Sequence, residues 1–442
     1  MRSIFVIAAI CGLVKSLESR DSSTDNGNEP LPPNDLALTP PMGWSSWNYF
    51  GPIINESIVI STIDFVVSSG LQAAGYHFIN IDDGWQRYKG NRSDHPGPLE
   101  ADPEKFPNGI KYVADYAHSK GLKLGIYSGP GETTCAKFTG TTEGSEDQDA
   151  VTFASWGVDH LKYDSCCSRG KEAPQELVRG DVRRMALELR ATGRDIVYHA
   201  CHCGWADVWT WARDEGANHW RMGQDISDDF NYPGFREDYY FDVLDMLTRG
   251  ENVSLAEYAG PGGWNDYDML IVGLNGLSPR LVGAGASNVE YRAHFSMWCM
   301  VASPLLIGTD VQTLSSYELA TVTNKDIIAI NQDPLGIAAT VVYEEQDGQL
   351  QYWARELDDG SVAVAFLNRG SELALMSLYI QRYLFVEWRS YTVKDLWTGE
   401  EQGPLKSPAF SAENATPSKV IPQEVIPQEV IPQEVTLKEV IP

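Results

Sequence analysis

The sequence predicts an α/β protein: a (β/α)8 TIM barrel followed by a small C-terminal antiparallel β-domain. Two observations lead to this prediction. Between residues 36 and 336, short apolar runs that end in polar residues alternate with longer amphipathic runs, a pattern typical of βα units and a parallel sheet. After residue 336 the runs become short and alternating, with Asp-Gly and Thr-Gly turn signals between them, as in antiparallel strands.

The first part contains eight strand candidates, and eight βα units are the number that closes into a barrel. The candidates are residues 42–48, 76–82, 122–127, 158–164, 196–200, 219–225, 264–269 and 304–308. Helical patterns lie between them at 57–74, 108–120 and 180–192, and each is followed by a glycine. A doubly wound open sheet is the alternative, but no G-x-G-x-x-G phosphate turn supports it. The catalytic barrel is therefore assigned to residues 36–336.

The β-domain is assigned to residues 337–410. Its predicted strands are 338–343, 349–354, 362–368, 373–380 and 391–396. Residues 411–442 read as a low-complexity tail in which Val-Ile-Pro-Gln-Glu recurs. Because a proline every five residues fits neither a helix nor a central strand, we expect this tail to be disordered or extended.

The N-terminal 19 residues read as a signal peptide, since Arg2 precedes an apolar run that is too short to cross a bilayer. Residues 20–35 are polar and read as a flexible lead-in. Sequons at Asn55, Asn91, Asn252 and Asn414 fit passage through the secretory pathway. We expect a secreted glycoprotein, or one in a lysosome-like compartment of that pathway.

Charge limits the possible partners. The formal net charge is −27, from 34 basic and 61 acidic residues. This excess of negative charge argues against nucleic acid and against an anionic membrane surface. No later apolar run reaches the length of a membrane span, so membrane insertion is not expected. A neutral or cationic small molecule is the expected ligand, and homo-oligomerisation remains open.

Polar side chains follow the predicted strands at their carboxyl ends, the end where barrel enzymes carry their active sites. Asp82 and Asp83 follow the second strand, Lys162 and Asp164 end the fourth, and Arg221 with Asp225 ends the sixth. A further segment carries Asp266 and Asp268. Single aspartates at strand ends are usually helix caps. A ring of carboxylates interleaved with tryptophans instead suits a polyhydroxylated neutral ligand, because carboxylates accept hydrogen bonds from hydroxyls and aromatic rings stack on sugar rings.

Several of these segments together resemble the ordered motifs of the α-galactosidase (melibiase) family, glycoside hydrolase family 27. The resemblance covers residues 36–336. It rests on Pro41-Met-Gly-Trp-Ser-Ser-Trp-Asn, Ile81-Asp-Asp-Gly-Trp, Lys123-Leu-Gly-Ile-Tyr, Leu161-Lys-Tyr-Asp-Ser-Cys, Trp220-Arg-Met-Gly-Gln-Asp, Gly260-Pro-Gly-Gly-Trp-Asn-Asp and Ile330-Asn-Gln-Asp-Pro-Leu-Gly.

The resemblance implies a retaining hydrolase of terminal α-galactosides. We expect it to need no cofactor and no metal. By position, Asp164 would be the nucleophile and Asp225 the acid/base. The substrate-binding residues would be Trp47, Asp82, Asp83, Tyr127, Lys162, His202, Arg221 and Asp266. We expect Lys162 to favour the ionised form of Asp164, whereas a carboxyl group near other carboxylates keeps its proton longer. Which carboxylate plays which role comes from the resemblance. The family's disulfide near the pocket would match Cys135 with Cys166.

The chain departs from the family pattern after the fifth strand, where it reads Ala200-Cys-His-Cys-Gly-Trp205. If Cys201 takes the place of the family cysteine, His202 replaces the polar residue near the sugar 2-hydroxyl; if Cys203 does, Gly204 replaces it. Specificity for an α-N-acetylgalactosaminide or a β-L-arabinopyranoside therefore remains open. The pairing of Cys167, Cys201, Cys203 and Cys299 is not determined by the sequence.

Two other classes of protein fit the same residues less well. A galactose-binding protein without catalysis would not need both Asp164 and Asp225. A metal-dependent barrel enzyme could use clustered aspartates for Mg²⁺ or Ca²⁺, but the tryptophans favour a sugar ring over an ion.

Overall fold

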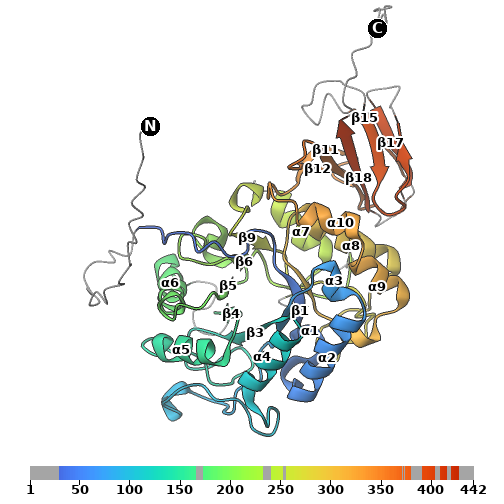
Figure 1. The fold of residues 1–442 in the computed structure, drawn as a ribbon. Helices are drawn as coiled ribbons and strands as arrows, with labels where there is room; N and C mark the ends of the chain where they lie inside the picture. Colours follow the sequence, from blue (N-terminus) through green and yellow to red (C-terminus); the bar gives the residue numbers. More distant parts are fainter. Residues whose placement is uncertain are drawn as a thin grey trace, which may run out of the picture.

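The computed structural model describes residues 29–165, 173–231, 240–251, 255–370, 372, 374–379, 391–403, 409–415 and 420–427. Within these residues the chain forms a barrel and a β-domain that follows it (Figure 1). The predicted signal peptide lies outside the described residues. No helix in the described ranges has the length and apolar character that crossing a bilayer requires.

The predicted eight-stranded barrel is confirmed. Its strands pair in parallel in the order β10-β1-β2-β3-β4-β5-β6-β9, and a parallel bridge from Leu270, just after β9, to Ile307 of β10 closes the sheet on itself. The strands are β1 Met42–Ser45, β2 Phe78–Asn80, β3 Lys123–Ser128, β4 His160–Asp164, β5 Val197–Cys201, β6 His219–Arg221, β9 Trp264–Asp266 and β10 Leu305–Ile307.

Helices surround the strands (Figure 1). They are α1 Trp47–Phe50, α2 Glu56–Ser68, α3 Leu71–Ala74, α4 Gly109–Ser119, α5 Glu146–Trp156, α6 Gln175–Ala191, α7 Val243–Glu251, α8 Asn288–Met300, α9 Ser316–Val322 and α10 Lys325–Asn331. Short 3₁₀ helices occur at Gly51–Ile53, Arg92–Asp94, Trp205–Thr210, Leu255–Tyr258 and Val311–Thr313.

Local sequence explains why the helices begin where they do. The Asn55 side chain accepts a hydrogen bond from the Ile58 amide and so caps α2. Ser287 and Ser315 form capping boxes at the starts of α8 and α9. The predicted helix 57–74 is two helices, because Gly70 takes a left-handed conformation (φ 94°) that ends the first one.

The sixth strand is shorter than predicted. β6 stops at Arg221, and Asp225 belongs instead to β7 Asp225–Ile226, which pairs in parallel with β8 Tyr240–Phe241 outside the barrel sheet. Arg221 therefore belongs to the barrel wall, whereas Asp225 is carried by a separate segment.

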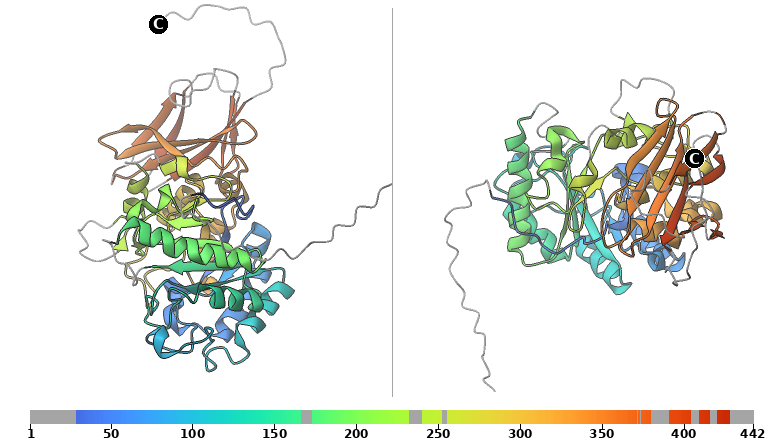
Figure 2. Two further views of the ribbon diagram at one scale, coloured as in Figure 1. Left: turned by 90° about the vertical axis from the view of Figure 1, so that its left-hand side faces the viewer. Right: turned by 90° about the horizontal axis from the view of Figure 1, so that it is seen from above.

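The β-domain contains two sheets. One has the order β11-β12-β13-β18-β15-β16 and the other pairs β14 with β17. Their strands are β11 Thr340–Glu345, β12 Leu350–Glu356, β13 Val362–Asn368, β14 Ala374–Tyr379, β15 Tyr391–Asp395, β16 Glu401–Gln402, β17 Ala409–Ala415 and β18 Val420–Pro427. Figure 2 shows this domain on one side of the barrel.

β12 and β13 are buried on both faces, because alternate side chains face opposite sides of a strand. Tyr352 and Phe366 pack with Met376 of the second sheet, whereas Trp353 and Ala365 belong to the main core of the barrel. The β-domain is thereby packed against the barrel through its larger sheet.

The expected tail boundary at residue 410 was wrong. β17 and β18 extend past it, and β18 lies inside the sheet, between β13 and β15. Only residues 423–425 of β18 pair on both sides; Pro422 lies beyond the last partner in β15, and Pro427 lies beyond the pairing with β13. Each proline thus sits where one neighbouring strand has already ended, so its missing amide hydrogen costs the sheet little.

The described end of the lead-in is not flexible as expected. The Leu31 amide donates a hydrogen bond to the Asp214 carbonyl. The amides of Asn34 and Asn218 also bond to each other, which ties this segment to the start of β6.

Candidate active site

Alternate residues of the barrel strands form inward-facing columns that run from the interior to the rim. On β4 the column is His160, Lys162 and Asp164, and on β6 it is His219 and Arg221. Because the strands are parallel, their carboxyl ends lie at one rim of the barrel. The predicted site residues from different strands therefore meet there.

Lys162 connects two carboxylates at this rim. Its Nζ lies 2.9 Å from Oδ2 of Asp82 and 3.9 Å from Oδ2 of Asp164. Burial disfavours the ammonium form, but the nearby negative groups outweigh it and raise the pKa of Lys162 well above its ordinary value. Lys162 is therefore a permanent cation beside Asp164, as expected from the sequence.

Arg221 holds two further carboxylates. Its Nη2 lies 2.8 Å from Oδ1 of Asp225, and its Nη1 lies 2.9 Å from Oδ1 of Asp268. Arg221 and Asp268 side chains are each 2% exposed, whereas the Asp225 side chain is 42% exposed. Of this group, Asp225 is the one within reach of a ligand.

The charges around Asp225 favour its ionised form. Burial raises the pKa of Asp225, but the charges of Arg221 and Lys162 outweigh burial and hold this pKa below its ordinary value. Asp268 behaves in the opposite way, since burial and the charge of Asp225 raise its pKa to about 6 despite Arg221. Of the two carboxyl groups paired with Arg221, Asp268 therefore keeps a proton to higher pH than Asp225.

Asp83 fixes the loop that follows β3. Oδ1 of Asp83 accepts a hydrogen bond from Thr134 Oγ1 at 2.9 Å, and Oδ2 accepts one from the Ala136 amide at 2.7 Å. Burial, offset in part by these bonds, raises the pKa of Asp83 to about 6. The sequence predicted contact with sugar, and the structure adds this anchoring of the loop.

Cys135 lies in the same loop and is disulfide-bonded. Tyr127 Oη donates a hydrogen bond to its sulfur at 2.9 Å, and the Tyr127 ring lies 5.3 Å from Nζ of Lys162. The predicted partner Cys166, like Cys167, lies outside the described residues, so that pairing stays a prediction. Cys201, Cys203 and Cys299 are free thiols.

Trp47 lies at the start of α1, immediately after β1. The guanidinium of Arg280 lies 4.7 Å from the centre of its ring. Arg280 also contributes to the lowered pKa of Asp225, so its charge is near both side chains. One face of the half-buried Trp47 ring is thereby occupied by a cation.

Asp266 lies deeper than its predicted contact with substrate requires, and it is only 2% exposed. Its Oδ1 accepts a hydrogen bond from the Asp268 amide, and its Oδ2 lies 3.2 Å from Nδ1 of His219. Burial raises the pKa of Asp266, but His219 and Arg221 hold it below the ordinary value. This arrangement favours a supporting position below the rim over direct contact with a sugar.

His202 is almost fully buried beside the end of β4. Its Nδ1 lies 2.6 Å from Ser165 Oγ, its ring meets Trp205 edge-on, and burial lowers its pKa to about 4. The imidazole is therefore neutral. Its Nε2 makes no hydrogen bond within the described part of the chain. The placement relative to a sugar 2-hydroxyl stays a prediction.

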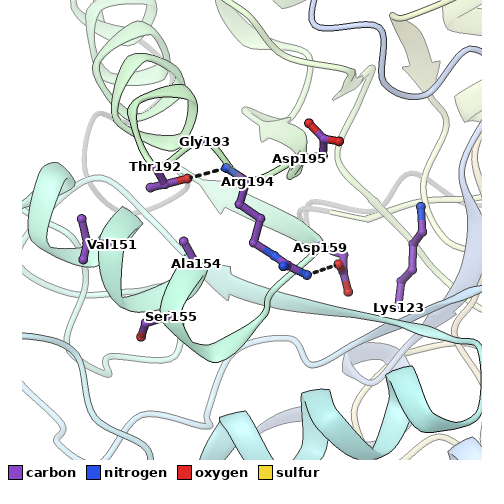
Figure 3. A pocket seen from close by; sticks show the side chains of 9 residues that line it. All are labelled: Lys123, Val151, Ala154, Ser155, Asp159, Thr192, Gly193, Arg194 and Asp195. Carbon is purple, nitrogen blue, oxygen red and sulfur yellow. Dashed lines mark hydrogen bonds and ion pairs between the residues drawn. The ribbon is translucent and has the colours of Figure 1, made fainter. Parts of the chain in front are cut away.

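A cavity lies at the opposite end of the barrel from the carboxylate rim, at the starts of β3 and β4. It has a volume of about 790 Å³, and its lining includes Lys123, Asp159 and Arg194. Figure 3 shows Arg194 bound to Asp159 across this cavity. Because it lies at the amino ends of the strands, this cavity is separate from the carboxylate rim.

Both domains match known protein families. Residues 39–333 match the family described as alpha galactosidase A, and residues 347–422 match its C-terminal β-sandwich domain. The chain belongs to the α-galactosidase family, glycoside hydrolase family 27. The second match ends within β18, in agreement with a β-domain that continues past residue 410.

Relatives of this family match over most of their length. An α-galactosidase of Cyamopsis tetragonoloba is 40% identical over 399 residues, which cover 90% of this chain and 89% of the relative. α-Galactosidase 2 of Arabidopsis thaliana is 44% identical over 77% of this chain and 78% of its own. The crystal structure of α-galactosidase I from Mortierella vinacea superposes with a TM-score of 0.80 at 33% identity, covering 89% of this chain and 98% of its own.

Membership of the α-galactosidase family makes the chain a glycoside hydrolase and confirms the recognition made from its motifs. The structure brings several further residues to the site that the sequence reasoning did not assign. Asp268 and Arg280 act on Asp225, and Ser165 holds His202. Asp268 lies two residues after Asp266, beyond the end of β9, where the sequence already showed a second carboxylate, but nothing local identified Arg280.

Proposed function

We propose that the protein is a retaining hydrolase that removes terminal non-reducing α-D-galactose from galactosides by double displacement. The observation that carries this proposal is the pair of aspartates in different electrostatic settings. Asp164 lies beside a permanent ammonium group and is 10% exposed, whereas Asp225 is paired to Arg221 and is 42% exposed. One carboxylate is suited to attack and the other to exchange protons with a ligand.

In the first step, an Asp164 oxygen attacks the anomeric carbon and forms a glycosyl ester. The bond to the leaving-group oxygen breaks, and Asp225 gives this oxygen its proton. In the second step, Asp225 removes a proton from water, the water oxygen attacks the anomeric carbon, and Asp164 is released as carboxylate. Two inversions leave the product with the α configuration of the substrate.

The lowered pKa of Asp225 has a consequence for this cycle. Asp225 must be protonated for the first step, and Arg221 opposes that state in the free enzyme. A bound sugar replaces water around the exposed Asp225 side chain, and desolvation raises a carboxyl pKa. Substrate binding is thus expected to help Asp225 take up its proton, and the free enzyme should work best at acidic pH.

Recognition of galactose would use the charged pair formed by Asp82 and Lys162. Asp82 accepts and Lys162 donates, and their 2.9 Å separation suits two adjacent hydroxyls of one sugar ring. Asp83 and Trp47 would complete this wall. Directional bonds of this kind are able to separate the axial 4-hydroxyl of galactose from the equatorial one of glucose.

The proposed substrates are α-galactosyl oligosaccharides. A related α-galactosidase from Saccharomyces cerevisiae, whose structure was determined with raffinose, is 30% identical with a TM-score of 0.78 and covers 90% of this chain and all of its own. Secretion and glycosylation, predicted from the N-terminus and the sequons, belong to the same proposal. Figure 2 places the β-domain away from the barrel helices α4 and α5, and no direct part in the chemistry is proposed for it.

A different specificity at C2 is the second candidate. It is favoured by His202, which carries a buried nitrogen without a protein partner in the described residues. A panel of aryl α-galactoside, α-N-acetylgalactosaminide and β-L-arabinopyranoside separates these activities. We expect the highest kcat/KM on the α-galactoside, and a preference for either other substrate would replace the proposed specificity.

The mechanism is tested by NMR of the product before it equilibrates. We expect α-galactose to appear first and the β anomer only by later mutarotation. Initial release of β-galactose would exclude double displacement. A protein that binds galactose but turns over none of the three glycosides would instead be a binding protein.

A further inference from the structure

Three histidines meet in the barrel interior, one step below the charged rim. His160 of β4, His199 of β5 and His219 of β6 are 1%, 3% and 0% exposed. Each offers a nitrogen, and these nitrogens all lie within 4.8 Å of one another. His160 and His219 lie two residues before Lys162 and Arg221, so they are the next inward-facing positions on those strands. The proposed hydrolysis uses none of the three.

Not every ring nitrogen of this cluster has a hydrogen-bond partner within the described residues. When the neutral ring of His219 donates from Nδ1 to Asp266, its Nε2 presents a lone pair. Nε2 of His160 lies 2.9 Å from that lone pair and must then be the donor, which leaves Nδ1 of His160 without a partner in the described residues. Nδ1 of His160 is thus an acceptor for which the described residues supply no donor.

Neither ring nitrogen of His199 makes a hydrogen bond within the described residues. Its Nε2 lies 3.1 Å from Oδ2 of Asp266 without the direction of a hydrogen bond, and its Nδ1 has no partner in the described chain. Both polar atoms of the buried Asn80 side chain are also unpaired there. Buried polar groups of this kind usually point to a bound water or ion.

A small cavity lies beside this cluster. Its volume is about 10 Å³, and its lining includes Asn80, His160, His199 and Asp266, but not His219. This is space for one small occupant. Asp82, Lys162 and Arg221 line the same cavity, so it lies directly beneath the candidate active site.

We propose that this cluster binds one divalent transition-metal ion, with His160, His199 and His219 as ligands. Imidazole is a preferred ligand of Zn²⁺, and a carboxylate that accepts from the other ring nitrogen is the usual partner of a zinc-bound histidine. Asp266 already stands in that relation to His219. With each nitrogen about 2.0–2.1 Å from a tetrahedral ion, the nitrogens would lie roughly 3.3–3.4 Å apart, so any pair near the present limit of 4.8 Å must move closer together on binding.

The surrounding charges permit a dication at this depth. Lys162 and Arg221 are the nearest cations, and each is already paired at 2.9 Å, with Asp82 and Asp268 respectively. Asp266 contributes a negative charge at the cluster itself. The ion would cross-link β4, β5 and β6 directly beneath the residues that handle the substrate. It is a structural and positioning site, outside the chemistry of hydrolysis.

The experiment uses the full chain, dialysed against EDTA, loaded with ZnCl₂ and desalted. We expect mass spectrometry of the metal to give one zinc per chain, and the thermal midpoint to rise on loading, because a ligand bound only to the folded state stabilises it. Loading with Co²⁺ should give the visible absorption of an imidazole-ligated ion, which EDTA should remove.

Matched variants locate the ion. H160Q and H199Q should each lose zinc retention and the thermal shift, whereas H95Q, in a loop outside the barrel interior, should keep both. If the two interior variants misfold by circular dichroism, the Co²⁺ spectrum of the unaltered chain decides. Absence of retained zinc, of a thermal shift and of the cobalt spectrum in the unaltered chain would identify the cluster as a hydrated polar core without metal.

Discussion

Strand β4 is preceded by Asp159 and ends with Asp164, and these two aspartates have different surroundings. At the amino end, Asp159 is bound by Arg194, lies 2.7 Å from Nε2 of His118 and accepts from the Leu124 amide. At the carboxyl end, Asp164 faces the shared rim, 3.9 Å from Lys162. The same residue type on one strand thus serves the fold at one end and faces a ligand site at the other.

The difference between the two aspartates comes from the other side chains that lie at each end of the strand. Arg194 also donates to the carbonyls of Gly157 and Val158, so the amino-end charges are used within local structure. At the carboxyl end, side chains from β2, β4, β6 and β7 converge, and carboxylates share their cations. Cavity size does not indicate function here, because the cavity of about 790 Å³ at the amino end is lined by groups already engaged in structure (Figure 3).

The largest expected effect separates the two aspartates. D164N should lower kcat on an aryl α-galactoside by about 10⁴-fold or more, because the nucleophile is lost, with little change in thermal stability. D159N should destabilise the fold by about 1–3 kcal/mol and leave kcat near normal, because it weakens a partly buried pair. Near-normal turnover by D164N would contradict the assignment of the nucleophile.

Lys162 provides the next test of the carboxyl end. K162M leaves Asp82 buried without its cation and removes a donor to the sugar, so kcat/KM should fall about 10²-fold. K123M is the matched control at the amino end, and it should change kcat/KM less than about twofold. Equal effects of both variants would mean that the two ends do not differ as proposed.

The pH profile tests the electrostatics of Arg221. Since Asp225 must be protonated for the first step, kcat/KM should fall as pH rises through its pKa. Arg221 lowers that pKa, so R221Q should move the alkaline limb of the profile to higher pH. R221K keeps the charge and should leave the limb near its original position, whatever its effect on the maximal rate. If the alkaline limb does not move in R221Q, this limb reports the titration of a group other than Asp225.

His202 should have the smallest effect. H202A is expected to change the ratio of kcat/KM between an α-galactoside and its 2-deoxy analogue by about tenfold, as for the loss of one hydrogen bond to a hydroxyl. S165A, which removes only the hydrogen bond that holds the ring, is the control and should change the ratio less. An unchanged ratio in H202A would limit His202 to packing beside Ser165 and Trp205.

The sequence alone was sufficient to predict the barrel, because its information is local. Each strand ends where an apolar run meets polar residues, as at Asp82 and Asp164, and parallel strands bring such ends to one rim. The period of two also sets Lys162 and Asp164 on the same side of β4. Composition and these motifs together predicted the family and its candidate nucleophile.

Only the tertiary structure decided the features that depend on distant partners. Pro422 and Pro427 are compatible with β18 because β15 and β13 end beside them, which no local rule reveals. The pKa of Asp225 is lowered rather than raised because Arg221, Lys162 and Arg280 surround it. The three interior histidines come from separate strands and meet only when the barrel closes. The sequence determines residue type and hydrophobic period directly, whereas the burial of a side chain and the charges around it depend on tertiary packing.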